Sequence, residues 1–430
     1  MDIQGVSEER QNVSLEDKFG NKGSTIFRAT TEAEISKIVR QADKEGKSIA
    51  IESGGTKRGY GGVKNDYDIT LSLKNYKGVV EHNVGDMTVT VRPGTTITEL
   101  QDFLREHNQM VSIDPNWPDQ ATIGGVIATN ESGSKRLKYG SARDLVIGLR
   151  LVYANGEIIR TGAKVVKNVA GYDMNKLFIG AMGTLGVITE ITMKLRPLPK
   201  FESLVQVSLP AEKIDALKTF AIAIQDSMLE PVSLELMNPV LSKKLTGREE
   251  YRLLIAFEDV EKAVRYQEDW VENHKPEGAD LEVHRNEEAQ EFWRTFSALA
   301  PNSLTDDQNE KTQAILKVGS KNIDVFEIMK ELSSLQSSSV TIEGHGGMGH
   351  GISQYTLSGT HEGVVAAIEE IRKIAESKKG YTIGTHLPFE LRKQVDAWGG
   401  KTSSFFLFEG IKKKVDPRNT LNHQRFIGGI

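Results

Sequence analysis

The chain has 430 residues, enough for two or three domains that each bury a hydrophobic core. Its 54 basic and 59 acidic side chains give a formal net charge of −5, which argues against a strongly electrostatic partner such as nucleic acid. The absence of cysteine excludes disulfides, thiolate-bound zinc, iron–sulfur ligation and a cysteinyl bond to a cofactor within this chain.

The chain begins with a polar tail, residues 1–19, and its first 25 residues contain no apolar core of the kind that a signal peptide needs. A membrane-spanning helix needs about 18 consecutive apolar residues, and the sequence contains no such run. We therefore expect a soluble, cytoplasmic protein of several domains.

Residues 20–199 alternate between helical and extended patterns. Thr31 and Glu34 have the spacing of a capping box and predict a helix that ends at Gly46. Thr96 and Glu99 repeat this signal for a second helix. The predicted extended segments are strands at 48–52, 68–73, 86–94 and 186–197 and a hairpin at 144–162 that turns at Asn155-Gly156.

Pro197 and Pro199 interrupt the pattern, and we place a domain boundary at residue 199. From 200 to 395, short strand patterns alternate with amphipathic helical patterns in a repeated β-α-β order. This order predicts an antiparallel sheet with helices on one face, of the split βαβ or ferredoxin-like type. The fold class is therefore α+β, and residues 396–430 close the chain as a helix followed by a turn.

A glycine-rich stretch, "IESGGTKRGYGG" at 51–62, directly follows a predicted strand. Successive backbone N–H groups can converge on an anion such as a diphosphate, and glycine permits the positive φ and the close approach that this requires. The stretch alone fits a phosphate cradle or a surface turn equally well. It is neither a Walker A loop nor a G-x-G-x-x-G fingerprint.

Two further small-residue segments favour the cradle. Thr122, Gly124 and Gly125 precede a short apolar helical stretch, where we expect exposed N–H groups at the helix N-terminus to form a second anion site. Gly183 and Gly186 lead into the last predicted strand of the first domain. Three such segments within one domain suit a single long ligand that lies between two subdomains.

The order of these motifs, S-G-G-T…G, then P-x-x-x-x-A-T-I-G-G…N…Y-G, then G-x-x-G-x-I-T-E, resembles the FAD-binding domain of the vanillyl-alcohol oxidase, or PCMH-type, flavoprotein superfamily. Within it, "VVKNVAGYDMNKLFIGAMGTLGVITEITMKLRP" and "VDAWGG" resemble the E-type FAD-binding subunits of glycolate oxidase. The resemblance implies a PCMH-type FAD-binding domain of two α+β subdomains at 20–199. It also implies a cap or substrate domain at 200–395 and a C-terminal segment at 396–430 that returns to the FAD domain.

The resemblance also implies the cofactor contacts. The loop that would wrap the FAD diphosphate consists of Ser53, Gly54, Gly55, Thr56, Lys57, Arg58, Gly59 and Tyr60. Asp114 and Pro115 would lie on the adenine–ribose side, where Gly186 and Ile188 would contact the adenine half. The residues expected along the diphosphate and flavin are Thr122, Gly124, Gly125 and Asn130, with Gly140 and Ser141 behind them and Asn422 touching flavin. Since residues 51–62 contain no histidine or cysteine, we expect noncovalent FAD.

A metal site is weighed and not predicted. Related 2-hydroxy-acid dehydrogenases carry H-A-G-D-G-N-L-H and G-E-H-G segments that hold a divalent ion beside the substrate. In "EGHGGMGHGI" His345 matches the first histidine, but Ile352 stands where the second should be, and His386 lies in "GTHLPFE" instead. A catalytic metal needs about three protein ligands, so a glycine-rich turn or pocket wall is the preferred interpretation of this segment.

The sequence and its resemblance together indicate an FAD-dependent oxidoreductase subunit that takes part in oxidising glycolate or a related 2-hydroxy acid. The resemblance implies a second flavoprotein subunit and an iron–sulfur subunit as partners, through which the chain would reach the inner face of the membrane. No catalytic residue is assigned. The alternatives are a self-sufficient D-lactate or 2-hydroxy-acid dehydrogenase, and a structural or electron-conducting FAD subunit without turnover.

Overall fold

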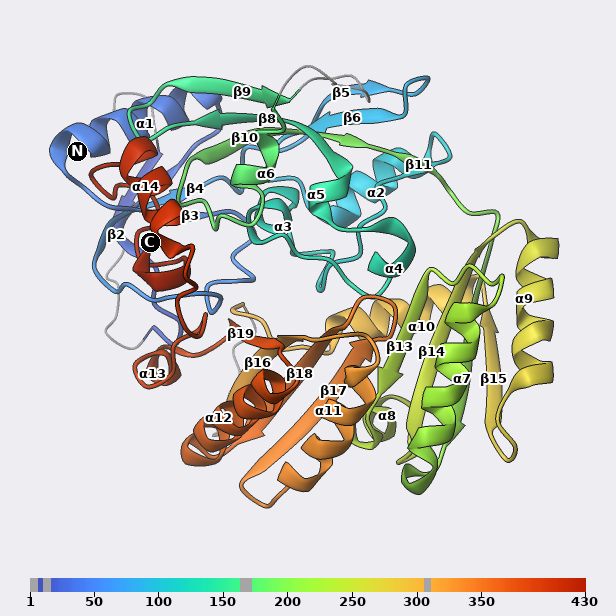
Figure 1. The fold of residues 1–430 in the computed structure, drawn as a ribbon. Helices are drawn as coiled ribbons and strands as arrows, with labels where there is room; N and C mark the ends of the chain where they lie inside the picture. Colours follow the sequence, from blue (N-terminus) through green and yellow to red (C-terminus); the bar gives the residue numbers. More distant parts are fainter. Residues whose placement is uncertain (1–6, 11–16, 163–171, 305–310) are drawn as a thin grey trace.

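The computed structural model describes residues 7–10, 17–162, 172–304 and 311–430. The molecule has two parts (Figure 1): an upper part with a four-stranded, a five-stranded and a two-stranded sheet, and a lower part built on one eight-stranded sheet. The boundary proposed at residue 199 falls between β11 (Arg196–Pro197), which pairs with β7 (Gln109–Met110) in the upper part, and β12 (Phe201–Leu209) in the lower part.

The first small sheet has the strand order β1-β2-β4-β3. The pairs β2–β4 and β3–β4 are parallel, and β1 adds antiparallel to β2. Its strands are β1 (Ser7–Arg10), β2 (Gly23–Arg28), β3 (Ile49–Glu52) and β4 (Tyr67–Ser72), and α1 (Glu32–Glu45) packs its buried isoleucines into the same core. The predicted capping box of Thr31 and Glu34 is present, and Gly46 ends α1 with φ +67°.

The second small sheet is antiparallel, with the order β5-β6-β10-β8-β9. Its strands are β5 (Val79–Asn83), β6 (Thr88–Val91), β8 (Val146–Val152), β9 (Ile158–Gly162) and β10 (Val187–Lys194). The β8–β9 hairpin turns at Gly156 with φ +80°, as the sequence predicts. The helices of this half are α2 (Ile97–Arg105), α3 (Ile123–Thr129), α4 (Arg136–Tyr139), α5 (Ala142–Leu145) and α6 (Asn175–Phe178).

The lower sheet has eight antiparallel strands in the order β15-β12-β14-β13-β17-β18-β16-β19. The remaining strands are β13 (Ser233–Met237), β14 (Tyr251–Asp259), β15 (Asp280–Arg285), β16 (Thr312–Gly319), β17 (Val340–Gly347), β18 (Ile352–Gly359) and β19 (Tyr381–His386). Each half has the 4-1-3-2 strand order of a split βαβ unit. The predicted ferredoxin-like fold is therefore confirmed, as two such units joined edge to edge through β13 and β17.

Helices cover both faces of this sheet. α7 (Ile214–Asp226), α9 (Glu261–His274), α11 (Asp324–Leu332) and α12 (His361–Ser377) share one continuous apolar core with it. On the other face, α8 (Pro239–Thr246) and α10 (Glu287–Ala298) pack in a smaller cluster, beside the part of the sheet that meets the upper domain. The expectation of helices on one face is thus correct for the large core and wrong for α8 and α10.

The C-terminal segment returns to the upper part after α13 (Phe389–Arg392) and ends beside α14 (Phe405–Val415) (Figure 1). The buried ammonium of Lys412 donates to Asp416 Oδ2 at 2.7 Å and to the carbonyl oxygens of Thr184 and Leu421. Leu421 bridges to Ile49 in β3, so the tail lies against the strand that leads into the glycine loop.

Candidate functional site

The glycine loop after β3 is held from outside by two buried arginines. Arg392 donates to the carbonyl oxygens of Arg58, Gly61 and Gly62, and Arg425 donates to those of Lys57 and Tyr60. Among the residues that the structure describes, the backbone N–H groups of residues 55–58 donate to no acceptor. Successive free N–H groups beside buried guanidinium groups form an environment that attracts an anion.

The second glycine segment plays a different part from the one expected. The N–H groups of Ile123 and Gly124 donate to the carbonyl oxygens of Thr95 and Pro93, and Thr122 Oγ1 accepts from Gly125. The prediction of exposed donors at this helix start is therefore wrong, because the 93–95 turn satisfies them. Gly124 is closely packed, since an added Cβ would lie 2.5 Å from Pro93 Cβ, whereas a Cβ at Gly125 would meet nothing closer than 3.5 Å.

The loop, α3 and the tail enclose a small cavity of about 110 Å³. Twelve of the sequence-predicted cofactor residues line it: Ser53, Gly54, Gly55, Thr56, Lys57, Arg58, Thr122, Gly124, Gly125, Gly186, Ile188 and Asn422. Free N–H donors and a glycine without a Cβ neighbour fit a diphosphate held close to the backbone. Asn422 has a structural role here, because its amide accepts from Ile51 N–H and donates to the Met182 carbonyl.

Two larger cavities continue from the small one. A large cavity of about 500 Å³ shares Thr56, Lys57 and Thr129 with it, and faces the lower sheet. An apolar cavity of about 470 Å³ meets the large cavity at Tyr60, Thr129, Asn130 and Lys317. The three cavities thus run from the glycine loop to the interface between the two parts, which suits one long ligand and a small second one.

The remaining predicted residues lie apart from the small cavity. Asp114 and Pro115 line the large cavity and are not brought together with Gly186 and Ile188, although both pairs were expected near adenine. The Asp114 carboxylate instead accepts from the N–H groups of Gly133 and Lys135, and burial raises its pKa to about 6. Gly59, Gly140 and Ser141 line none of the three cavities.

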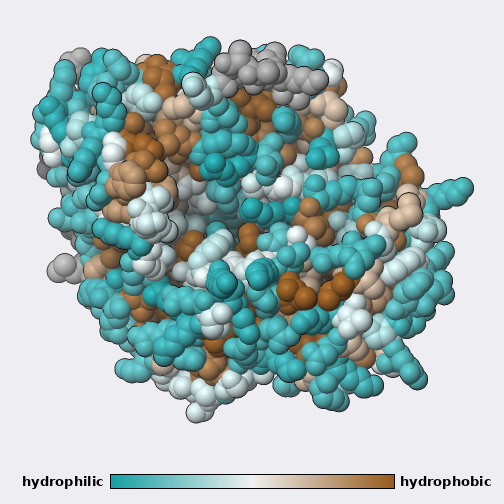
Figure 2. All heavy atoms as spheres, in the orientation of Figure 1, coloured by the Kyte–Doolittle hydropathy of each residue, from teal (hydrophilic) through white to brown (hydrophobic). Residues whose placement is uncertain are grey.

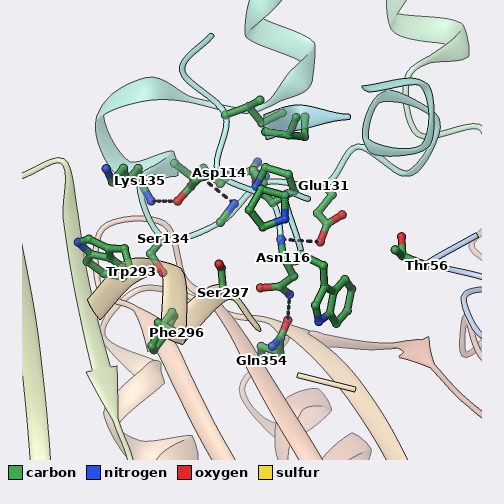
Figure 3. Close-up of a pocket in the computed structure, with 18 of the residues that line it drawn as sticks. Thr56, Asp114, Asn116, Glu131, Ser134, Lys135, Trp293, Phe296, Ser297 and Gln354 are labelled. Carbon is green, nitrogen blue, oxygen red and sulfur yellow. Dashed lines mark hydrogen bonds between the residues drawn. The ribbon is translucent and has the colours of Figure 1, made fainter. Parts of the chain in front are cut away.

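The basic loop around residue 135 joins the two parts of the molecule. Lys135 forms an ion pair with the buried Glu258, and Tyr139 donates to the same carboxylate. Nearer the cavity centre, the Asn116 side chain donates to Gln354 Oε1 at 3.2 Å, and its backbone N–H donates to Glu131 Oε1 at 3.4 Å (Figure 3). These contacts fix the roof of the large cavity over the lower sheet.

A buried carboxylate and two histidines occupy the junction of β13 and β17. Glu235 Oε2 lies 2.9 Å from His345 Nδ1, and Glu235 Oε1 lies 3.4 Å from His350 Nε2. Burial alone would raise the pKa of Glu235, but the two histidines hold it below its ordinary value. All three residues line the large cavity.

The segment lines the large cavity, as the pocket-wall interpretation expects, and the cluster adds a carboxylate to it. His345 belongs to strand β17, and His350, which the motif comparison did not consider, lies beside Glu235 after the strand ends. Among the described residues, no group of three His, Cys, Asp or Glu side chains is arranged to hold a metal ion. The second histidine was visible in the sequence; Glu235 gave no signal, because only the β13–β17 pairing brings it there.

Lys317 on β16 was also missed. Its ammonium has no hydrogen-bond or ion-pair partner among the described residues and lines both the large and the apolar cavity. Burial, with help from Arg136, lowers its pKa to about 8. A buried cation at a cavity wall that makes no hydrogen bond or ion pair with the described residues is suited to hold the carboxylate of a small ligand.

Comparison with known proteins assigns the upper part of the chain. Residues 24–162 match the family described as FAD binding domain. The chain is 33% identical over 273 residues to the mitochondrial D-lactate dehydrogenase (cytochrome) of Arabidopsis thaliana, covering 61% of this chain and 47% of that protein. It is 38% identical over 132 residues to glycolate oxidase subunit GlcE of Escherichia coli, covering 30% of this chain and 38% of that subunit.

Glycolate oxidase subunit GlcD of Bacillus subtilis is 35% identical over 205 residues, covering 48% of this chain and 43% of that subunit. The chain therefore spans less than half the length of each of these curated relatives. Among solved structures, alkyldihydroxyacetonephosphate synthase aligns with a TM-score of 0.71 at 17% identity, over 93% of this chain and 76% of that one. p-Cresol methylhydroxylase aligns with a TM-score of 0.70 at 16% identity, over 94% and 88%.

Proposed function

Since residues 24–162 match the FAD binding domain family, we propose that this chain holds FAD noncovalently and takes part in oxidising glycolate or a related 2-hydroxy acid to the 2-oxo acid. The observation that carries the proposal is the run of cavities from the free N–H groups of residues 55–58 to the unpaired ammonium of Lys317. One end suits a diphosphate and the other a small carboxylate. Bound FAD supplies an acceptor for the hydride that leaves the α-carbon.

The cofactor residues follow from the small cavity. We propose that the N–H groups of residues 55–58 hold the diphosphate, with Arg58 and Arg425 supplying positive charge at its edge. Gly125 provides space for close approach. Tyr60 and Asn130, at the junction of the large and apolar cavities, would line the flavin half. Gly59, Gly140 and Ser141 are proposed to support this arrangement from behind.

The substrate residues follow from the large cavity. Lys317 would bind the substrate carboxylate, and His345 would accept the hydroxyl proton. Glu235 fixes a tautomer of His345 with its proton on Nδ1, which leaves Nε2 as the acceptor. His350 Nδ1 accepts from the Ile352 N–H, which leaves the proton of a neutral His350 on Nε2, 3.4 Å from Glu235 Oε1.

Electrons would leave through partners. The chain has no cysteine and cannot hold an iron–sulfur cluster on thiolates. We propose a second flavoprotein subunit and an iron–sulfur subunit as partners, in keeping with relatives that are named as subunits of glycolate oxidase. The proposed location is the cytoplasm, where the partners hold the complex at the inner face of the membrane.

A second candidate is a self-sufficient dehydrogenase for D-lactate or a similar acid, the activity named for other relatives. The cluster of Glu235, His345 and His350 favours this candidate. This chain alone supplies a base and the carboxylate that orients it, and both line the large cavity. An electron-conducting subunit without turnover has no such need for this cluster.

Anaerobic stopped-flow reduction of the FAD-loaded chain separates the candidates. Glycolate and D-lactate are added with and without zinc and with and without co-expressed partners, and the flavin absorbance is followed. We expect slow or absent bleaching of the isolated chain and rapid bleaching in the complex. Rapid bleaching of the isolated chain by either acid would replace the subunit assignment with the self-sufficient dehydrogenase. A chain that takes up no FAD would contradict both candidate functions.

A further inference from the structure

Helix α14 places bulky apolar side chains in solvent. Phe406 is 65% exposed, Leu407 54% and Phe408 39%, three consecutive residues at the start of the helix. Figure 2 shows apolar atoms gathered at the upper left of the molecule, where Figure 1 places α14. Clustered exposed residues of this size mark a contact surface more often than isolated ones do.

The exposed side chains are rigidly presented. Phe405 is buried, and its ring lies 6.4 Å from that of Phe408, which in turn lies 5.9 Å from Phe426. Trp398 continues this chain of rings to Tyr60 in the glycine loop, with centroid distances of 5.1 Å to Phe426 and 5.4 Å to Tyr60. The base of the helix is thus anchored, and the residues beside Phe405 must point outward.

The other end of the same exposed side is cationic. A helix turns about 100° per residue, so Lys413 lies in line with Phe406, and Lys414 lies in line with Leu407 on the side opposite Phe405. Both lysines are exposed, whereas Lys412 is buried in its ion pair with Asp416. Lys401 lies over the Phe405 ring at 4.3 Å, and Glu409 is the single carboxylate of the helix.

We propose that α14 docks on the surface of an anionic lipid bilayer, with Phe406 and Leu407 in the acyl boundary and Lys413 and Lys414 at the headgroups. On a helix that lies in the membrane surface, long lysine side chains beside apolar ones can reach the headgroups while the apolar side chains enter the acyl boundary. The described residues contain no helix long and apolar enough to cross a membrane, so this contact is peripheral.

A bilayer fits this surface better than a protein does. The three apolar side chains expose on the order of 300 Å², well below the ~800 Å² per partner of a specific protein interface. Lysine is depleted in protein interfaces but abundant beside the apolar face of membrane-surface helices. Phe408 and Ile411 of α14 also line the apolar cavity, so docking would bring that cavity to the membrane.

Vesicle sedimentation of the full FAD-loaded chain tests the proposal. The protein should sediment with vesicles of phosphatidylcholine and phosphatidylglycerol, and much less of it should sediment with vesicles of pure phosphatidylcholine. We expect Phe406→Ser with Leu407→Ser to weaken partitioning about tenfold or more. Lys413→Gln with Lys414→Gln should weaken it and remove its sensitivity to salt.

Met228→Ser with Tyr266→Ser is the matched control, because both residues are exposed apolar side chains of the lower part and should leave partitioning unchanged. All variants should keep their flavin content and melting temperature, since the changed side chains are exposed. The proposal is overturned if anionic vesicles leave the wild-type protein in solution, or if Phe406→Ser with Leu407→Ser sediments like wild type. It is also overturned if light scattering shows that this pair instead abolishes a wild-type dimer, which would assign the surface to a second copy.

Discussion

We expect the adjacent glycines Gly124 and Gly125 to serve different purposes: Gly124 allows close packing of the fold, and Gly125 leaves space for the ligand. An added Cβ at Gly124 would meet the backbone and ring of Pro93 within 3.0 Å, whereas Gly125 borders the small cavity without a close protein neighbour. We expect Gly125→Val to keep its melting temperature and to lose FAD affinity by on the order of tenfold or more. Flavin titration and a thermal melt measure the two effects separately.

Gly124→Ala is the matched variant, and it should unfold more easily by about 1–3 kcal/mol because of overpacking. Unchanged flavin affinity in Gly125→Val would place the diphosphate elsewhere.

We expect Lys317 to make substrate binding sensitive to pH. Its pKa of about 8 lies below the ordinary 10.5 of lysine, so the amine of the free protein loses its charge as the pH rises through about 8. Affinity for an unreactive carboxylate such as oxalate, followed in the flavin spectrum, should therefore fall above this pH.

Substitutions at position 317 separate charge from shape. Lys317→Arg should bind oxalate without the fall near pH 8, because a guanidinium stays protonated. Lys317→Met should bind oxalate about tenfold to a hundredfold more weakly at neutral pH, because the loss of one charged hydrogen bond typically reduces affinity by this factor. If oxalate binds Lys317→Met as it binds wild type, the carboxylate site lies elsewhere.

At the scale of elements, one buried ion pair attaches the C-terminal tail. Lys412 on α14 holds Asp416, and the Asp416 carboxylate accepts from the N–H groups of Thr420 and Leu421. Lys412→Met would leave a buried carboxylate without its cation, which typically costs about 3–5 kcal/mol. We expect a lower unfolding midpoint in denaturant and weaker FAD binding, because Asn422 depends on the same tail.

Lys413→Met is the control for this prediction. Lys413 is an exposed neighbour on the same helix, and its loss should change stability by less than about 0.5 kcal/mol. Equal stability of the two variants would show that the pair contributes nothing.

At the scale of the whole molecule, the manner of FAD attachment can be tested directly. Residues 51–62 contain no histidine or cysteine, but the fold brings the buried His386 of β19 beside Gly59. Burial, followed by the charge of Arg392, lowers the pKa of His386 to about 3 and keeps it neutral. We expect acid precipitation to release all flavin into the supernatant.

Flavin that remains in the pellet would contradict noncovalent attachment, and His386→Ala would then show whether this residue holds it. A colourless protein that takes up no added FAD would contradict the assignment of the cofactor itself.

The sequence alone determined the features that depend on neighbours in the chain. The capping boxes at Thr31 and Thr96, the turn at Gly156 and the repeated β-α-β order follow from local hydrogen bonding, φ preferences and apolar periodicity. The glycine segments also predicted an FAD-binding domain, and the family match over residues 24–162 includes the first two of them.

Only the tertiary structure decided which side chains meet. The β13–β17 pairing sets Glu235 between His345 and His350, although more than 100 positions separate it from either. Carbonyl oxygens of the 93–95 turn accept the hydrogen bonds from the first N–H groups of α3. The loop at 133–135 donates its N–H groups to the Asp114 carboxylate. Such contacts depend on strand register and loop closure across long stretches of chain, and no local pattern specifies them.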